Sequence, residues 1–276
     1  MISSFADKQQ IMDLLTHILS GVAAGTVVAG FSSKSRRNRV ATVAFGGFGG
    51  MFPDFDVISL WSGFDATFGR LFNLKHTGRE IFSMQLWYSH HGFLHSIVGS
   101  LIVATLIGLT IYLLRNRFRR LSLKGFGKSV LEHKEILLTF IAGFINHTIE
   151  DMPTPSGGWE GVNFLWPLKS YSGGTGDIWW WNNYDIFLIV VGVIFVNTLL
   201  LFSRKLFRTN LKRFTLLIFV AGVLLGTYQI KTRGFDFSTS RGRVCEEKSK
   251  EIQKEILGHR VFSIMEAFDN MVRIPF

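Results

Sequence analysis

The sequence predicts an all-α membrane protein: a polytopic helical bundle with about five to six apolar segments and a C-terminal amphipathic helix. Hydrophobic residues make up 47% of the 276-residue chain, and its mean hydropathy is +0.27. Charged residues make up only 18%, below the roughly 25% typical of soluble domains. Long runs, such as residues 92–114, contain no Asp, Glu, Lys or Arg. A soluble domain does not need such runs, whereas a lipid surrounding requires them.

Six apolar segments follow one another along the chain. They cover residues 11–31, 40–52, 92–114, 136–149, 186–203 and 214–230. A helix needs about 20 mostly apolar residues to cross a bilayer, so the second and fourth segments are too short to cross unaided. Polar residues that face protein could extend them, or they could be half-buried helices. The glycine-rich stretch 46–50 in the second segment favours close packing of helices in a membrane.

The chain changes character after residue 230. We therefore divide it into a transmembrane domain, residues 1–230, and a polar C-terminal tail, residues 231–276. Within the tail, residues 243–270 are largely polar but carry apolar side chains at roughly helical spacing. These side chains are Ile252, Ile256, Val261, Ile264, Met265 and Phe268. The pattern predicts an amphipathic helix on the surface.

The net charge of +10 is concentrated in three basic clusters. They are Lys34, Arg36, Arg37 and Arg39; Arg115, Arg117, Arg119, Arg120, Lys124 and Lys128; and Arg204, Lys205, Arg208, Lys212 and Arg213. A strongly basic chain can indicate a nucleic-acid partner. Here, however, each cluster follows the first, third or fifth apolar segment, as the positive-inside rule expects of cytoplasmic loops. We therefore expect membrane lipid, and no nucleic acid, as a partner.

If all six segments cross the membrane, the outer face holds residues 53–89, residues 152–184 and the tail. All seven Trp fall in the first two of these stretches, at Trp61, Trp87, Trp159, Trp166, Trp179, Trp180 and Trp181. Trp favours the interface between membrane and water. The distribution of Trp therefore agrees with the orientation that the basic clusters predict.

Side chains that can bind a metal occur in four short clusters, each at one end of an apolar segment. The clusters are His17; Asp54 and Asp56; His90, His91 and His95; and His147 and Asp151. Ionisable groups at membrane depth are costly, which favours a functional explanation. The orientation was derived from Lys and Arg alone, yet it places all four clusters at the outer edge. The sequence therefore predicts a single metal site that faces outward.

The spacing within the clusters suits metal ligands. His147 and Asp151 are four residues apart, which places them on one face of a helix, and His91 and His95 share this spacing. Asp54 and Asp56 are two apart, which would place them on one side of an extended segment. Each cluster alone can be explained as a helix cap or a turn. Together they indicate zinc or manganese, which accept mixed His and Asp ligands better than calcium or magnesium do.

The candidate ligands outnumber the four of a tetrahedral zinc site. Two metals, or one metal with supporting carboxylates, are both compatible with this number. A bound divalent metal lowers the pKa of its water and so favours hydrolysis. Asp54, Asp56, Asp151 or Glu150 could then serve as general base.

Five motifs in order resemble the YdjM family, described as membrane-bound metal-dependent hydrolases. They are Thr16-His17 with Gly21; Gly50-Met51-Phe52-Pro53-Asp54-Phe55-Asp56; His90-His91-Gly92-Phe93-Leu94-His95-Ser96; Asn146-His147-Thr148-Ile149-Glu150-Asp151 with Thr154-Pro155; and Phe164-Leu165-Trp166-Pro167. The resemblance covers about residues 11–200. In it His90 and His95 match the family histidines, His91 replaces an arginine, and Leu94 replaces a threonine.

The resemblance implies a membrane-bound metal-dependent hydrolase, and we expect it in the bacterial inner membrane. Because the site opens at the level of the lipid headgroups, we expect an ester or phosphoester substrate, with lipids among the candidates. His17, Asp54, Asp56, His90, His91, His95, His147 and Asp151 would hold the metal. One alternative is a transporter of divalent cations, because intramembrane His and Asp also mark ion pathways. Against it, no paired ionisable residues lie midway along the segments. The other alternative is a non-catalytic membrane protein with a structural metal, whose site would be closed to water.

The basic clusters generate a test of orientation. A fluorescent-protein reporter fused after Arg120 is expected to be active in the cytoplasm, because this position lies within the most basic cluster of the chain. Paired alkaline phosphatase and fluorescent-protein fusions at this site measure the orientation. Activity confined to the outer compartment would reverse the predicted topology.

Overall fold

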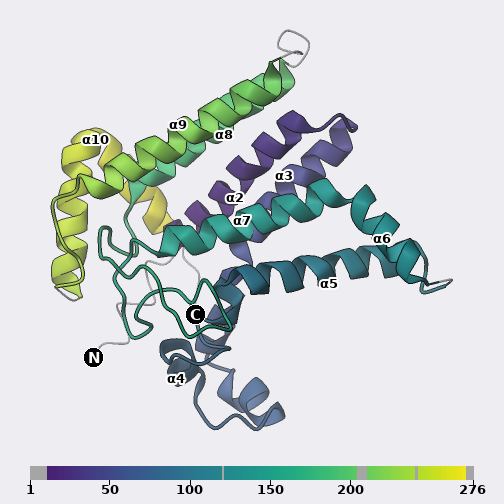
Figure 1. Ribbon diagram of the computed structural model, residues 1–276. Coiled ribbons are helices and arrows are strands. Elements are labelled where there is room, and N and C mark those ends of the chain that lie inside the picture. Colours follow the sequence, from purple (N-terminus) through teal and green to yellow (C-terminus); the bar gives the residue numbers. More distant parts are fainter. Residues whose placement is uncertain (1–10, 120, 204–209, 240–241, 272–276) are drawn as a thin grey trace.

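The computed structural model describes residues 11–119, 121–203, 210–239 and 242–271, and these residues form a helical bundle (Figure 1). The α-helices are α2 (Ile11–Phe31), α3 (Arg36–Met51), α4 (Gly78–Ser83), α5 (Ile97–Arg115), α6 (Leu123–Glu132), α7 (Lys134–Asp151), α8 (Tyr184–Phe202), α9 (Leu211–Lys231) and α10 (Arg243–Met271). Short helical turns at η1 (Pro53–Leu60), η2 (Asp65–Gly69) and η3 (Phe93–His95) lie between them. Among the described residues, β-structure is limited to isolated bridges.

Four helices are long and apolar enough to cross a membrane, namely α2, α5, α8 and α9. The expectation of five to six spans was therefore too high. α3 begins with basic residues, and α7 has charged residues at both ends, so neither is uniformly apolar. These two helices instead pack on α2 and on each other. They correspond to the second and fourth apolar segments, which the sequence already marked as too short.

Glycines bring α2, α3 and α7 into backbone contact. A Cβ atom at Gly21 would overlap the carbonyl of Gly46, and one at Gly143 would overlap the same carbonyl. A Cβ at Gly50 would overlap the carbonyl of His17. Small residues allow such close approach in membrane helices, where packing rather than the hydrophobic effect drives association. The predicted packing role of the glycine-rich stretch 46–50 is confirmed.

A buried polar contact holds α2, α8 and α9 together away from this glycine interface. Asn197 Nδ2 donates to Thr26 Oγ1 at 2.9 Å and to the carbonyl of Thr215 at 3.2 Å. All three residues are fully or almost fully buried. Polar side chains bond across helices in this way because lipid offers them no partner.

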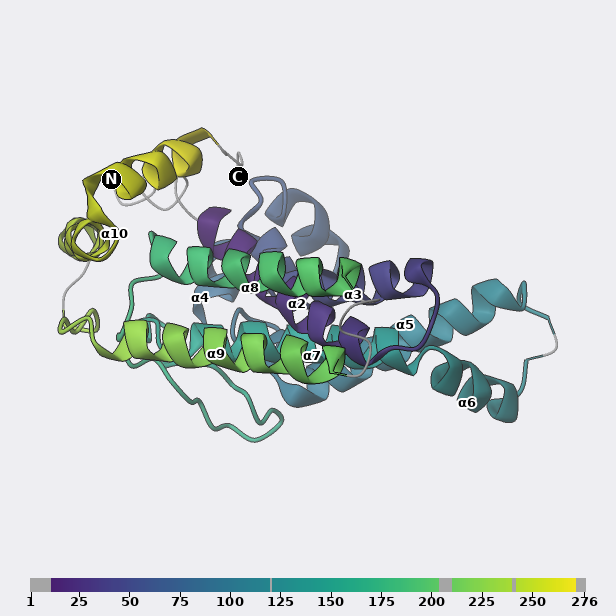
Figure 2. The same ribbon diagram turned by 90° about the horizontal axis from the view of Figure 1, so that it is seen from above.

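The connections sort to the two ends of the bundle (Figure 2). The α2–α3 connection, the C-terminal end of α8, the N-terminal end of α9 and α6 lie at one end, with the described parts of the basic clusters. The segment from η1 to η3, residues 152–183 and α10 lie at the other end. Arg120, Arg204, Lys205 and Arg208 lie outside the described residues. The predicted grouping of the loops is therefore observed, and their side of the membrane remains a prediction.

The tail helix α10 bends at Gly258, whose φ is 71°, so the predicted single amphipathic helix is divided in two. Of the predicted apolar stripe, Ile252 and Met265 are buried. Ile256, Val261, Ile264 and Phe268 are exposed, because the bend changes the face that each half presents to the bundle. The buried face instead includes Cys245, Gln253 and Phe262.

A buried ion pair fixes the tail to the spans. Arg233 Nη2 donates to Asp185 Oδ1 at 2.9 Å, and Gln253 Nε2 donates to the same oxygen at 2.8 Å. Tyr184, next to Asp185, packs with Phe262 in the second half of α10. Since one buried charge without its partner is strongly unfavourable, this contact holds α8, the end of α9 and α10 in one arrangement.

The glycine interface predicts an asymmetric effect of alanine. Gly50→Ala is expected to destabilise the protein by about 1–3 kcal/mol, because the methyl group overlaps the His17 backbone. Gly192→Ala in α8 is the matched control, since no atom lies within 4 Å of its added Cβ. Thermal unfolding in detergent should show a lower Tm for the first variant alone. Equal Tm values would show that the helices do not approach as described.

Candidate metal centre

The four predicted clusters come together at the end of the bundle that carries α10. His17 comes from α2, Asp54 and Asp56 from η1, His90, His91 and His95 from the turn before α5, and His147 and Asp151 from the last turns of α7. Three groups have ligand atoms within 4.8 Å of one another. They are His90, His91 and His95; His17, His147 and Asp151; and Asp54, His95 and His147. The predicted convergence is therefore observed.

The helix α7 presents His147 and Asp151 on one face, as their spacing predicts. His147 Nε2 lies 3.2 Å from Asp151 Oδ2. The other ring nitrogen, Nδ1, lies 2.7 Å from the carbonyl oxygen of Gly50 and must donate, because a carbonyl can only accept. In the neutral ring, Nε2 therefore turns a lone pair toward the centre.

His147 Nε2 lies among other potential ligands at distances that suit a shared ion. It is 3.3 Å from His95 Nε2 and 3.5 Å from Asp54 Oδ1, and His95 Nε2 is 3.4 Å from Asp151 Oδ2. Ligands about 2.1 Å from a tetrahedral zinc lie about 3.4 Å from each other. Four separations among Asp54, His95, His147 and Asp151, from 3.2 to 3.5 Å, match that geometry.

Other histidines also direct Nδ1 away from the centre. His17 Nδ1 lies 2.8 Å from Glu150 Oε2, and His91 Nδ1 lies 3.0 Å from the carbonyl oxygen of Gly161. His90 Nδ1 lies 2.8 Å from Asp56 Oδ1. Ligand histidines usually direct one nitrogen to a carboxylate or carbonyl, which fixes the ring and leaves the other nitrogen for the metal. Glu150, a candidate base, thus contacts His17 and acts on its orientation.

The prediction that Asp54 and Asp56 share one side of an extended segment was wrong. Pro53 opens the 3-10 helix η1, and its tight turn directs the two carboxylates to different partners. Asp54 faces His147, whereas Asp56 Oδ1 contacts His90 and Asp56 Oδ2 lies 3.5 Å from His95 Nδ1. Asp56 is therefore placed to orient two histidines.

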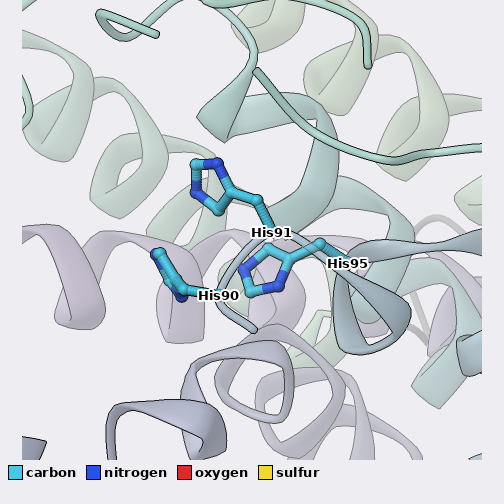
Figure 3. A group of neighbouring side chains, drawn as sticks. All are labelled: His90, His91 and His95. Atoms are coloured by element: carbon cyan, nitrogen blue, oxygen red, sulfur yellow. The ribbon is translucent and has the colours of Figure 1, made fainter. Parts of the chain in front are cut away.

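The prediction that His91 and His95 share a helix face was also wrong. α5 begins at Ile97, after Ser96 accepts a hydrogen bond from the Gly99 N–H at 2.9 Å. His91 has a φ of 62°, and His95 lies in η3. The turn at residues 90–95, and not the helix α5, places the side chains of His90, His91 and His95 close together (Figure 3).

Two neighbouring features of the centre were not predicted from the sequence. Residues 152–183 form its cover, and there the Asn163 N–H donates to the His91 carbonyl at 2.9 Å. Phe82 stacks on His90 with ring centroids 4.5 Å apart, and Trp159 packs against His90 and His91. The only sequence signal was the concentration of Trp in these loops, which indicated an interface. These contacts restrict the histidine rings.

The electrostatics of the centre favour a bound cation. Burial raises the pKa of Asp56 to about 8 and lowers the pKa of His90 to about 4 and of His91 to about 3. His90 and His91 are thus unprotonated at neutral pH, which is the ligand form. Burial acts in the same direction on His147, but the nearby Asp54 and Asp151 carboxylates outweigh it and raise the pKa of His147 instead. Asp151 Oδ2 and His95 Nδ1 are buried without a hydrogen-bond partner among the described residues. A divalent cation suits this set, because it supplies the missing positive charge.

Comparison with known families agrees with this arrangement. A family profile described as "YdjM inner membrane protein" matches residues 12–234. The chain belongs to the YdjM family. The match extends past the residues 11–200 that carry the motifs, includes all four candidate spans, and ends before α10. As a YdjM protein with several apolar helices, the chain is a multi-pass membrane protein. Comparisons with curated proteins and with solved structures found no match.

The contact between His17 and Glu150 predicts an effect on metal affinity. Glu150→Ala should weaken zinc binding by about 10–100-fold, because His17 loses the carboxylate that orients it. Glu132→Ala is the control, since Glu132 pairs with Arg115 at the α6 end of the bundle. Competition with a chromophoric chelator measures both affinities. Unchanged zinc affinity in Glu150→Ala would remove the proposed orienting role.

Proposed function

We propose that this YdjM protein is a metal-dependent hydrolase that acts on an ester or phosphoester. The observation that carries the proposal is the buried group of Asp54, His95, His147 and Asp151, whose donor atoms are spaced as ligands of one ion. A zinc or manganese ion bound there would lower the pKa of water and so supply a nucleophile at neutral pH.

Some residues of the centre would hold the metal, and one of them would also accept a proton. His95 and His147 have no exposed side-chain surface, and the Asp151 side chain is 10% exposed. The Asp54 side chain is 18% exposed, so its carboxylate is the member of this group most open to water. We assign Asp54 the additional role of accepting the proton from the attacking water.

The position of the centre suits a lipid substrate. α5, a candidate span, begins at Ile97, directly after His95 and Ser96. The centre therefore lies at the N-terminal end of that span. Lipid esters and phosphoesters lie at the same depth, between headgroups and acyl chains. Trp159, packed against two of the histidines, is a residue type that favours this interface. We propose that the substrate enters from the membrane, with the centre facing outward.

Transport and a purely structural metal are supported less well. An ion pathway requires ionisable groups along the spans. Apart from their first three positions and their last, α2, α5, α8 and α9 carry no Asp, Glu, Lys or Arg. A structural zinc site is closed, whereas Asp54 leaves this one partly open to water.

Hydrolysis by the purified protein is the test of this function. The protein, loaded with zinc or manganese in detergent, should cleave at least one of p-nitrophenyl phosphate, bis(p-nitrophenyl) phosphate, p-nitrophenyl butyrate and a fluorogenic phospholipid. His147→Ala should abolish cleavage. Asp54→Asn should lower kcat by roughly 10²–10⁴-fold, because the amide cannot accept a proton.

The control for these substitutions is His133→Ala, which changes a histidine at the start of α7, away from the centre. It should retain full activity. Cleavage by metal-replete His147→Ala at the wild-type rate would contradict the proposed hydrolase function. Transport of a cation or a purely structural metal would then be the better explanation of the centre.

A further inference from the structure

The centre contains more inward-facing donors than one ion can take. The group of Asp54, His95, His147 and Asp151 already completes a four-ligand shell. His17, His90 and His91 remain outside it, each with Nδ1 held by a carboxylate or carbonyl. This arrangement costs desolvation and conformational entropy at three further histidines, which a single ion does not explain.

The donors form two histidine groups that meet at Asp151. In the first group, His17 and His147 lie with ring centroids 4.0 Å apart, and Asp54 faces His147. In the second group, His90, His91 and His95 surround a common space, with centroids 4.3–4.9 Å apart (Figure 3). The first group comes from helices and η1, and the second comes from one turn.

The Asp151 carboxylate lies between the two groups. Its Oδ1 is 3.3 Å from His17 Nε2. Its Oδ2 is 3.4 Å from His95 Nε2 and 3.9 Å from His91 Nε2, and also 3.2 Å from His147 Nε2. The carboxylate thus contacts both groups, with Oδ1 facing His17 and Oδ2 facing histidines of both, as expected of a carboxylate that bridges two ions.

We propose that the centre binds two divalent cations bridged by Asp151. His17, Asp54 and His147 would hold the first cation, and His90, His91 and His95 would hold the second. His95 would then belong to the second cation and not to the four-residue shell of a one-ion centre. Asp56, which contacts His90 and His95, orients the ligands of the second cation. The proposal rests on the metal centre of the proposed function, but it does not depend on hydrolysis. It differs from a one-ion centre in the metal content and in the histidines on which that content depends.

Metal content of the purified full-length protein tests the proposal. After loading with zinc and removal of free metal, elemental analysis should give about two ions per chain, since each histidine group completes a separate shell with Asp151. The double variant His90→Ala/His91→Ala should retain about one, and so should His17→Ala. His133→Ala and His259→Ala, which change histidines outside the centre, should retain about two.

Manganese gives an independent readout that requires no substitution. Wild-type protein loaded with Mn²⁺ should show the electron paramagnetic resonance spectrum of an exchange-coupled pair. The double variant should show the spectrum of an isolated ion. His90→Gln/His91→Gln replaces the double variant if size-exclusion chromatography shows that the alanine protein does not fold.

The outcomes separate the pair of ions from the hydrolase. One ion per chain in the wild type, unchanged by loss of His90 and His91, would overturn the pair while leaving hydrolysis possible. An isolated-ion spectrum at full loading would also overturn it. Two ions without any hydrolysis would support the pair and reject the enzyme. No bound metal would overturn both.

Discussion

The carbonyl oxygen of Gly50 accepts the hydrogen bond of His147 Nδ1, and the same glycine lies against the backbone of His17. Packing and site geometry therefore depend on one contact. Without a side chain at this position, α2 and α3 approach closely, and α7 joins them at Gly143 and Gly46. His17, Asp54, His147 and Asp151 then come from three elements whose separation is set by backbone contact rather than by flexible side chains. Such a frame holds ligands within the narrow limits that a metal site needs.

The cost of the centre is electrostatic. Three aspartates and five histidines lie close together, with most of their surface removed from water. Buried carboxylates are unfavourable unless positive charge or hydrogen bonds compensate for lost hydration. Among the described residues, no Lys or Arg pairs with these aspartates: the buried Arg233 pairs with Asp185, and Lys34 pairs with Glu135 at the other end. A bound cation would compensate for the lost hydration and would fit the distances around Asp151 Oδ2, which has no hydrogen bond within the described part of the chain.

Much of this arrangement was predictable, because a bilayer restricts both the length of the helices that cross it and the side on which basic loops lie. Apolar length identified the helices, and the basic clusters gave a topology that gathered His17, Asp54, His95, His147 and Asp151 at one end. Local geometry was predicted less well. Pro53 starts a 3-10 helix instead of an extended segment, and Ser96 starts α5 later than hydropathy indicates. The starts of η1 and α5 both depend on local hydrogen bonds, which the residue composition indicates only weakly. The number of spans was overestimated because α3 has only 16 residues and α7 carries charged residues at both ends. The hydrogen bond from His91 Nδ1 to the Gly161 carbonyl joins residues that are 70 positions apart, which no local sequence pattern reveals.

The hydrogen bond between His91 and Gly161 has a consequence for biosynthesis. The ligands occupy positions from His17 to Asp151, and Gly161 and Asn163 fix His91 only after α7 has been made. A chain that is synthesised and inserted from its N-terminus therefore places α2, α3 and α5 before its centre can close. A metal held by the complete set of ligands, with His91 fixed by Gly161, would therefore bind only after the loop that follows α7 has been made.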